Sequence, residues 1–410
     1  MSKKITLGKV AITPKGRWIP NVQYEKLDVV LFEGSAWIAR KANIGQVPSE
    51  ESEYWRIAVE GVDTSSDAEE KVVAFLPDMF YLTPGVTLEI YNRQVCPDAD
   101  KYHFKWTCSI GRAYKRKFSV TASLLQTGLF PLKLEIVNDI GDTVWVREVN
   151  MYVGVLNAYN TLNICPIGSM YSDGKAWLEE VSSNLSENQI GFTGNVAAGN
   201  GIFHEGRTGW SSTTYLTKAE EYNTDTDESM VNPFWNGERF SWQKYVDDYN
   251  RYCDAVQLFF GEDELLTSDA DTLVNNLMQM IDSIRTEGGA FPIFVVLPPC
   301  IGNQDGIAKL VTSEYRNFDG KCKYEIDKMY IQTAKKIYDT ISNSIYENVF
   351  FIPLTQCFDS ENNFPTTTMK VNPRSSASEK IQSNPRKPTE EGYKQMADVM
   401  YGVYSVILAQ

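Results

Sequence analysis

The chain has 410 residues and a formal net charge of −14, with 39 Lys and Arg against 53 Asp and Glu. Hydrophobic residues make up 43% and charged residues 22%, which excludes wholesale disorder, collagen-like repeats and a coiled-coil rod. The acidity argues against a nucleic-acid-binding protein, whose surface needs clustered positive charge. The one basic cluster, RAYKRK at 112–117, is expected to solvate a strand edge.

Histidine and cysteine usage limits the chemistry further. His103 and His204 are the only histidines, so a His-rich metal centre is impossible. The seven cysteines contain no CxxC pair and predict neither a disulfide scaffold nor a zinc site, and no metal or cofactor is expected. The N-terminal segment MSKKITLGKV lacks the apolar stretch of a signal peptide, and no run approaches about 18 apolar residues. We therefore expect synthesis in a reducing cytoplasm and no membrane insertion.

The first half of the chain has a β pattern. Short alternating runs, DVVLF at 28–32 and AWIA at 36–39, predict a small β-module over residues 1–61. Residues 62–73 are mostly polar, lack apolar periodicity and are predicted to be a linker. Residues 74–155 contain several segments rich in β-branched and aromatic residues, spaced about 10–15 residues apart, which is typical of a β-sandwich.

From residue 156 onward, strand and helix patterns alternate. Apolar runs at 162–167, 254–260, 292–299 and 348–354 predict strands. Amphipathic segments at 176–185, 271–285, 323–343 and 389–408 predict helices. This alternation predicts a three-layer α/β domain with a parallel sheet over residues 156–410, so the whole chain is expected to be multidomain.

Ligands of doubly wound sheets bind beyond the carboxyl ends of the strands, where this chain has the loops GSMYSDG (168–174), GEDELL (261–266), CIGNQDG (300–306), TQCFD (355–359) and QSNPRKPTEEGY (382–393). Seven segments stand out along this part of the chain, some of them within these loops: GSMYSDG (168–174), EGRTGW (205–210), NPFW (232–235), GED (261–263), NQDG (303–306), VNPRSS (371–376) and KPTEEGY (387–393). Over residues 156–410, their order and spacing resemble the SGNH (GDSL-type) hydrolases, and more narrowly the versions carried on phage tail proteins. The resemblance implies an SGNH-like fold.

The same resemblance implies that the hydrolytic residues are missing. Met170 stands at the nucleophilic serine, Asn384 at the aspartate and Lys387 at the histidine of the family. Gly209 matches the glycine that donates to the oxyanion, whereas Glu262 replaces the asparagine donor. A thioether has no proton to lose, and a carboxylate repels an oxyanion. We expect these positions to lie together at the carboxyl end of the sheet, where Glu262 could pair with Lys387.

A relocated active site is the alternative. Ser169 and Ser172 flank Met170, and His204 lies just before the EGRTGW block. Against this alternative, moving a nucleophile by one residue at a strand-to-helix turn points it elsewhere. The competing interpretation is that both serines cap the next helix and that His204 is an ordinary, partly buried histidine. His103, in the alternating YHFKW, is interpreted as a residue of the sandwich.

The N-terminal module has a resemblance of its own. Its segments GKVAITPKGRW and YEKLDVV resemble small aromatic modules of phage tail fibres and baseplates, which are similar to chitin-binding modules. Trp18, Tyr24, Trp37 and Trp55 are therefore candidates for stacking on sugar rings. The other interpretation makes them the core of a small domain, and both remain open.

Together these resemblances suggest a structural virion protein of a tailed phage, an exposed fibre, baseplate or capsid appendage with an inactive SGNH-like domain. The expected partners are other virion proteins, further copies of the chain in a homo-oligomer, and a host surface glycan. Its expected localisation is the virion, after assembly in the host cytoplasm. Two alternatives are an active carbohydrate or cell-wall esterase with a relocated nucleophile and a purely architectural decoration.

Overall fold

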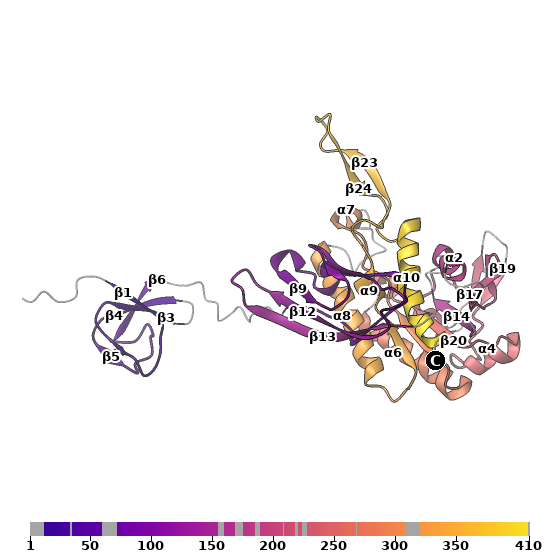
Figure 1. The fold of residues 1–410 in the computed structure, drawn as a ribbon, viewed down its shortest axis with the longest axis horizontal. Helices are drawn as coiled ribbons and strands as arrows, with labels where there is room; N and C mark the ends of the chain where they lie inside the picture. The colour runs from indigo at the N-terminus through magenta and orange to yellow at the C-terminus, as the bar shows by residue number, and fades with distance from the viewer. Residues whose placement is uncertain are drawn as a thin grey trace, which may run out of the picture. The chain divides into compact units, whose positions relative to one another are not determined.

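The protein divides into two compact units, Met1–Val72 and Val73–Gln410 (Figure 1). The computed structural model describes residues 12–32, 35–59, 72–154, 160–168, 175–184, 189–207, 209–217, 220–223, 228–267, 269–308 and 320–408. Each unit is described by itself below.

The N-terminal unit is a small β-module. Its strands are β1 (Thr13–Arg17), β2 (Gln23–Tyr24), β3 (Asp28–Phe32), β4 (Ser35–Ala39), β5 (Asn43–Ile44) and β6 (Trp55–Val59). A four-stranded sheet has the order β1-β3-β4-β6, with β1 parallel to β3 and the other pairs antiparallel, while β2 and β5 form a separate ribbon. Its core consists of Tyr24, Val30, Trp37, Ala39 and Trp55.

A β-sandwich opens the second unit. Its elements are β7 (Met79–Leu82), β8 (Thr87–Tyr91), α1 (Asn92–Val95), η1 (Ala99–Lys101), β9 (His103–Thr107), β10 (Arg112–Ala113), β11 (Lys117–Thr121), β12 (Gly128–Val137) and β13 (Thr143–Val153). One sheet has the order β10-β11-β8 and the other β7-β13-β12-β9. Leu132, Leu134 and Ile136 are fully buried on one face of β12, as the period-two pattern predicts.

A mostly parallel sheet lies at the centre of the α/β domain. Its strands are β14 (Leu162–Gly168), β15 (Ile190–Phe192), β16 (Val196–Gly199), β17 (Ile202–Gly206), β20 (Ala255–Phe259), β21 (Ile293–Val296) and β22 (Val349–Ile352). The order is β16-β17-β14-β20-β21-β22, with β15 also paired to β14, and all pairs except β16–β17 are parallel. The predicted alternation of strands and helices around a parallel sheet is confirmed.

The helices of this domain surround the sheet and its loops. They are α2 (Lys175–Asn184), α3 (Ser212–Tyr215), α4 (Trp242–Tyr249), α5 (Glu262–Thr267), α6 (Ala270–Gly288), α7 (Gln304–Ile307), α8 (Lys323–Ser342), α9 (Leu354–Cys357) and α10 (Glu390–Leu408). Val256 and Leu258 of β20 share a core with α6 and α8, whereas Phe259 contacts Trp177 of α2. The two helix pairs α6–α8 and α2–α10 thus pack on opposite faces, which explains why the strands are apolar throughout.

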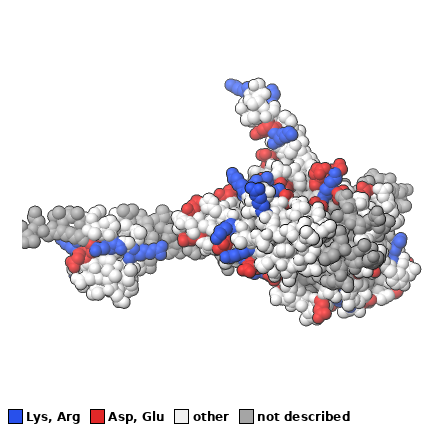
Figure 2. Space-filling view, viewed as in Figure 1, with Lys and Arg blue, Asp and Glu red and all other residues white. Residues whose placement is uncertain are grey.

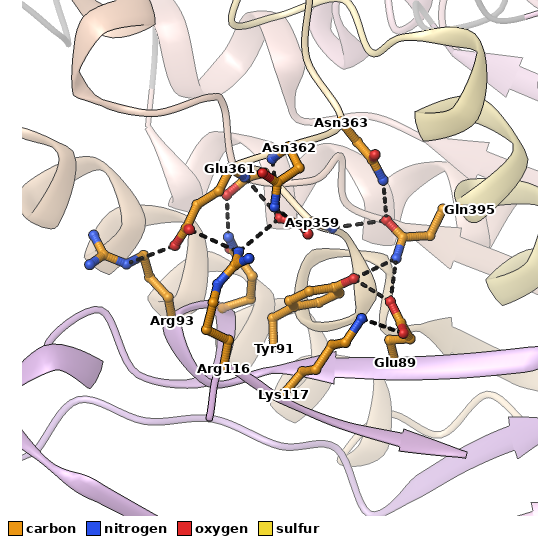
Figure 3. A network of polar contacts seen from close by, with 12 residues as sticks. Glu89, Tyr91, Arg93, Arg116, Lys117, Asp359, Glu361, Asn362, Asn363 and Gln395 are labelled. Carbon is orange, nitrogen blue, oxygen red and sulfur yellow. Dashed lines mark hydrogen bonds and ion pairs between the residues drawn. The ribbon is translucent and has the colours of Figure 1, made fainter. Parts of the chain in front are cut away.

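The sandwich and the α/β domain pack together within this unit. β7 contacts α10, and α1 contacts α8 and α9. A network of polar contacts joins them (Figure 3): the guanidinium of Arg116 pairs with Asp359 (3.1 Å) and Glu361 (2.8 Å), and Glu89 accepts from the side-chain amide of Gln395 on α10 at 3.3 Å. The basic cluster expected to solvate a strand edge therefore sends Arg116 across the domain junction. The predicted boundary between residues 155 and 156 lies outside the described residues.

Two antiparallel hairpins extend the α/β domain. They are formed by β18 (Glu220–Asn223) with β19 (Glu228–Val231), and by β23 (Thr366–Lys370) with β24 (Ser378–Gln382). The second stands clear of the domain in Figure 1. Every residue of β23 is exposed, so this hairpin contributes little to the core of the described chain.

Candidate functional site

The carboxyl ends of β14, β17 and β20 meet at one edge of the sheet. Gly168 ends β14 with a φ of +149°, and a Cβ at this position would lie 2.0 Å from the carbonyl oxygen of Phe259 on β20. The amide of Arg207 donates to the carbonyl of Gly168 at 3.0 Å. These contacts hold the EGRTGW block against the end of the first strand, and only glycine fits at position 168.

The structure describes some, but not all, of the positions that the resemblance aligned with catalytic residues of SGNH hydrolases. Met170, with Ser169 and Ser172, lies outside the described residues. Gly209 lies in the turn after β17 with a φ of +75°, and Glu262 is the first residue of α5, directly after β20. Asn384 and Lys387 belong to the segment between β24 and α10.

Glu262 and the segment before α10 are in direct contact. The Oε1 atom of Glu262 accepts from Nε of Arg386 at 2.9 Å, and Nη2 of Arg386 lies 2.6 Å from the same oxygen. Both side chains are largely buried. The Oδ1 atom of Asn384 accepts from the amides of Arg386 (3.1 Å) and Lys387 (3.2 Å), which fixes this turn. Three of the predicted positions are therefore brought together, and Arg386 is the ion-pair partner that the sequence reasoning missed.

A second charged pair is buried beneath this edge. Glu205 is fully buried, and its carboxylate accepts from the amide of Asn195 (2.7 Å) and the hydroxyl of Tyr245 (2.9 Å) and pairs with Arg207 (3.1 Å). Burial raises the pKa of Glu205, and the neighbouring Arg207 opposes that shift. Because Glu205 and Arg207 are two residues apart at the end of a strand, they share a face, and this spacing was a signal for the pair.

His204 belongs to the same buried region. Its side chain is 2% exposed, and its Nδ1 accepts from the amide of Gly206 at 2.9 Å. Burial, reinforced by the positive charge of Arg207, lowers the pKa of His204 to about 4. The ring is thus neutral at pH 7 and lies beneath the surface. His103, by contrast, is exposed on β9 of the sandwich and lies 3.4 Å from Asp139.

Glu264 connects three segments at this edge. Its Oε2 accepts from the amide of Gly261 at 3.0 Å, and its Oε1 accepts from the amide of Ser212 at the start of α3. Nδ2 of Asn276 on α6 donates to the hydroxyl of Ser212 at 3.0 Å. The carboxylates of this edge therefore have structural partners. Among the described residues, no group of three or more His, Cys, Asp or Glu side chains could hold a metal ion.

The aromatic residues of the N-terminal unit are mainly core. Tyr24, Trp37 and Trp55 are 1%, 6% and 1% exposed, and their polar tips bond to the main chain within the module. Rings buried in this way present no face to a sugar. They form the core because a domain of this size has few other large side chains to pack. Trp18 is half-buried and packs edge-on against Phe32. The core interpretation therefore applies to three of the four candidate glycan-binding residues.

All seven cysteines are free thiols. Cys165 and Cys300 are buried, and Cys253 is partly buried. No helix in the described ranges is both long and apolar enough to cross a membrane.

Comparison with known proteins finds structural likeness alone. No protein family matches the sequence, and no curated protein matches it. Similar solved structures, which are SGNH/GDSL-type esterases, include a carbohydrate esterase family 3 protein from Talaromyces cellulolyticus, with 12% identity, a TM-score of 0.35, and coverage of 60% of this chain and 98% of that one. A family two carbohydrate esterase from Clostridium thermocellum has 12% identity and a TM-score of 0.31, with coverage of 78% and 92%. These TM-scores lie well below 0.5, so the likeness supports no statement about function.

Proposed function

We propose that the chain is a non-hydrolytic surface protein whose SGNH-like domain serves as a binding and assembly body. Its proposed setting is the exposed part of a tailed-phage virion, as a fibre, baseplate or capsid appendage that contacts host surface glycans. The setting rests on the sequence resemblance, and the loss of hydrolysis rests on the residues of the candidate site.

The ion pair between Glu262 and Arg386 supports the loss of hydrolysis most directly. An acyl-transfer site needs hydrogen-bond donors aimed at the developing oxyanion. Glu262 offers carboxylate oxygens instead of an amide N–H, and its Oε1 lies 2.6 Å from the guanidinium of Arg386. The position at which an SGNH hydrolase is expected to have an amide donor is therefore occupied by a neutralised charge pair.

His204 gives independent support. The alternative esterase would need a base that reaches a nucleophile near Ser169 or Ser172. His204 is buried, and its Nδ1 already accepts the amide hydrogen of Gly206. The other histidine of the sequence, His103, lies in the sandwich and so outside the α/β domain.

An ester assay tests this proposal. The purified full-length protein is incubated with p-nitrophenyl acetate beside the variants Ser169→Ala and Ser172→Ala. We expect all three to release p-nitrophenol at the same rate, no faster than a heat-denatured control. Turnover by the wild type that either substitution abolishes would overturn the proposal and establish a relocated nucleophile.

Restoring the family residues is the complementary experiment. The combined variant Met170→Ser, Glu262→Asn, Asn384→Asp and Lys387→His is compared with the same variant carrying Arg386→Ala, which removes the guanidinium from the edge. Esterase activity in either one, with none in the wild type, would show that the surrounding frame still fits a reacting ester. Activity already present in the wild type would contradict the proposed function.

A further inference from the structure

A pocket of about 530 Å³ lies at the junction between the sandwich and the α/β domain. Its walls come from the end of β8, from α1 and η1, from Tyr102 and the start of β9, from the turn between β10 and β11, and from the segment 359–361 after α9. None of Gly209, Glu262, Asn384 and Lys387 lines it. Its volume falls in the range of about 300–1,000 Å³ typical of small-molecule sites, which often lie between domains.

The charges of this pocket balance. Its lining contains the cations Arg93, Lys115 and Arg116 and the carboxylates Asp100, Asp359 and Glu361. Arg116 bridges Asp359 and Glu361, and Arg93 pairs with Asp100 and lies 3.5 Å from Glu361. The cations are therefore largely compensated, which disfavours a phosphate or another polyanion as ligand. Figure 2 shows no large field of one sign on the face it displays, where acidic and basic side chains are interspersed.

The polar groups at one side of the pocket are held in place before any ligand arrives. The carboxylate of Asp359 accepts from the amides of Glu361 (3.1 Å) and Asn362 (3.2 Å), and its own amide donates to Gln395 at 2.9 Å (Figure 3). The side chains of Arg116 and Glu361 nevertheless remain 46% and 38% exposed. Fixed polar groups that still contact water can exchange that water for ligand hydroxyls at low entropic cost.

Aromatic rings supply the apolar part of the same pocket. Tyr102 and Phe104 are half-buried, and Tyr114 is 50% exposed. The guanidinium of Arg112 lies 5.3 Å from the centre of the Tyr114 ring and helps to fix it. Aromatic rings beside planar donors and acceptors suit a molecule with both apolar C–H faces and hydroxyl groups.

We propose that this pocket binds a neutral saccharide, with the Tyr114 ring against a sugar face and Arg116 and Glu361 bonded to its hydroxyls. The proposal deepens the proposed function, since it rests on the glycan contact included there and assigns it to the domain junction. It moves that contact away from the N-terminal module, whose rings Tyr24, Trp37 and Trp55 are buried.

Saturation-transfer NMR on the full-length protein tests the site. The probes are glucose, galactose, mannose, rhamnose and N-acetylglucosamine, with inorganic phosphate as the anionic comparison. We expect at least one sugar to bind and Tyr114→Ala to weaken its binding about tenfold or more. Tyr252→Ala is the matched control, because Tyr252 is 73% exposed and lies outside the pocket lining. Circular dichroism confirms that both variants are folded.

The following outcomes would contradict the proposed saccharide site. Binding that survives Tyr114→Ala but is lost in Trp18→Ala would overturn the assignment while leaving glycan contact in place. Phosphate that displaces the sugar would show an anion site instead. No binding by any of the five sugars at about 10 mM would overturn the pocket as a saccharide site. Ester hydrolysis, measured separately, would overturn the proposed function whatever the pocket binds.

Discussion

His204 provides a quantitative test of the buried cluster at the carboxyl edge of the sheet. The perturbation is His204→Asn, whose Oδ1 can accept the amide hydrogen of Gly206 that Nδ1 accepts at 2.9 Å in the wild type. The substitution keeps the hydrogen bond and removes the titrating ring. Any difference in the pH dependence of stability between the two proteins therefore reports the protonation of His204.

The magnitude follows from the pKa shift. Burial lowers the pKa of His204 from 6.5 to about 4, so the folded chain binds fewer protons than the unfolded chain between these values. The contribution of His204 to the free energy of unfolding is therefore fully present above pH 6.5. It is lost as the pH falls toward 4, because the unfolded chain takes up the proton more readily. Between pH 7.5 and pH 5 the loss amounts to about 2 kcal/mol at 1.36 kcal/mol per pKa unit.

Urea unfolding at pH 7.5 and pH 5 measures the effect. Glu205 has a raised pKa and contributes in the opposite direction, since its folded form holds a proton more readily as the pH falls. That contribution is common to wild type and variant, so the difference between them isolates His204. We expect the wild type to lose about 2 kcal/mol more than His204→Asn over this range. The control His103→Gln removes a histidine ring that is exposed.

Two results would refute this reasoning. Parallel loss of stability by wild type and His204→Asn would show that the ring is not held neutral by burial. NMR resonances of the His204 ring that titrate near pH 6.5 in the folded protein would show that it is accessible to protons, and the relocated-base alternative would regain support.

Three further predictions address the frame, the hairpin and the N-terminal module. Gly168→Ala should unfold the protein or cost more than about 3 kcal/mol, measured by urea unfolding, because its Cβ would lie 2.0 Å from the Phe259 carbonyl oxygen. Replacing residues 367–381 by Gly-Gly should leave the melting temperature unchanged in calorimetry, because β23 is exposed throughout; a fall of several degrees would contradict this. Trp55→Ala should lower the free energy of unfolding of the N-terminal module by about 3–5 kcal/mol and abolish its folding, whereas Trp18→Ala, at a half-buried position, should lower it less. NMR spectra of the two variants would show whether the module is still folded.

The fold was largely predictable, since its signals are local. A strand buried on both faces must be apolar throughout, as the run 254–260 is, and each such run in the second half of the chain coincides with a parallel strand. The glycine at 168 was also readable, because it follows the first of these runs. The pairing of Glu262 with Arg386 was less accessible, because Arg386 and Lys387 are adjacent cations in a turn whose backbone Asn384 fixes.

Contacts between distant segments were not predictable from the sequence. Arg116 and Asp359 are 243 residues apart, and nothing in the RAYKRK cluster indicates that a guanidinium will bridge two carboxylates of another domain. The roles of the module's aromatic residues were undecided for a related reason. Both core packing and sugar stacking favour large rings, and burial alone separates the two.

The two polar regions of the second unit differ in what their charges can still do. At the sheet edge, Glu262 and Arg386 are largely buried against each other, and Glu205 is fully buried beside Arg207. Charges that are paired and mostly buried have little to offer a reacting substrate, and removing one partner leaves the other uncompensated. At the domain junction, Arg116 and Glu361 are also paired, but they line an open pocket and are 46% and 38% exposed. A ligand there displaces water without breaking an ion pair, and this favours recognition at the junction over chemistry at the edge.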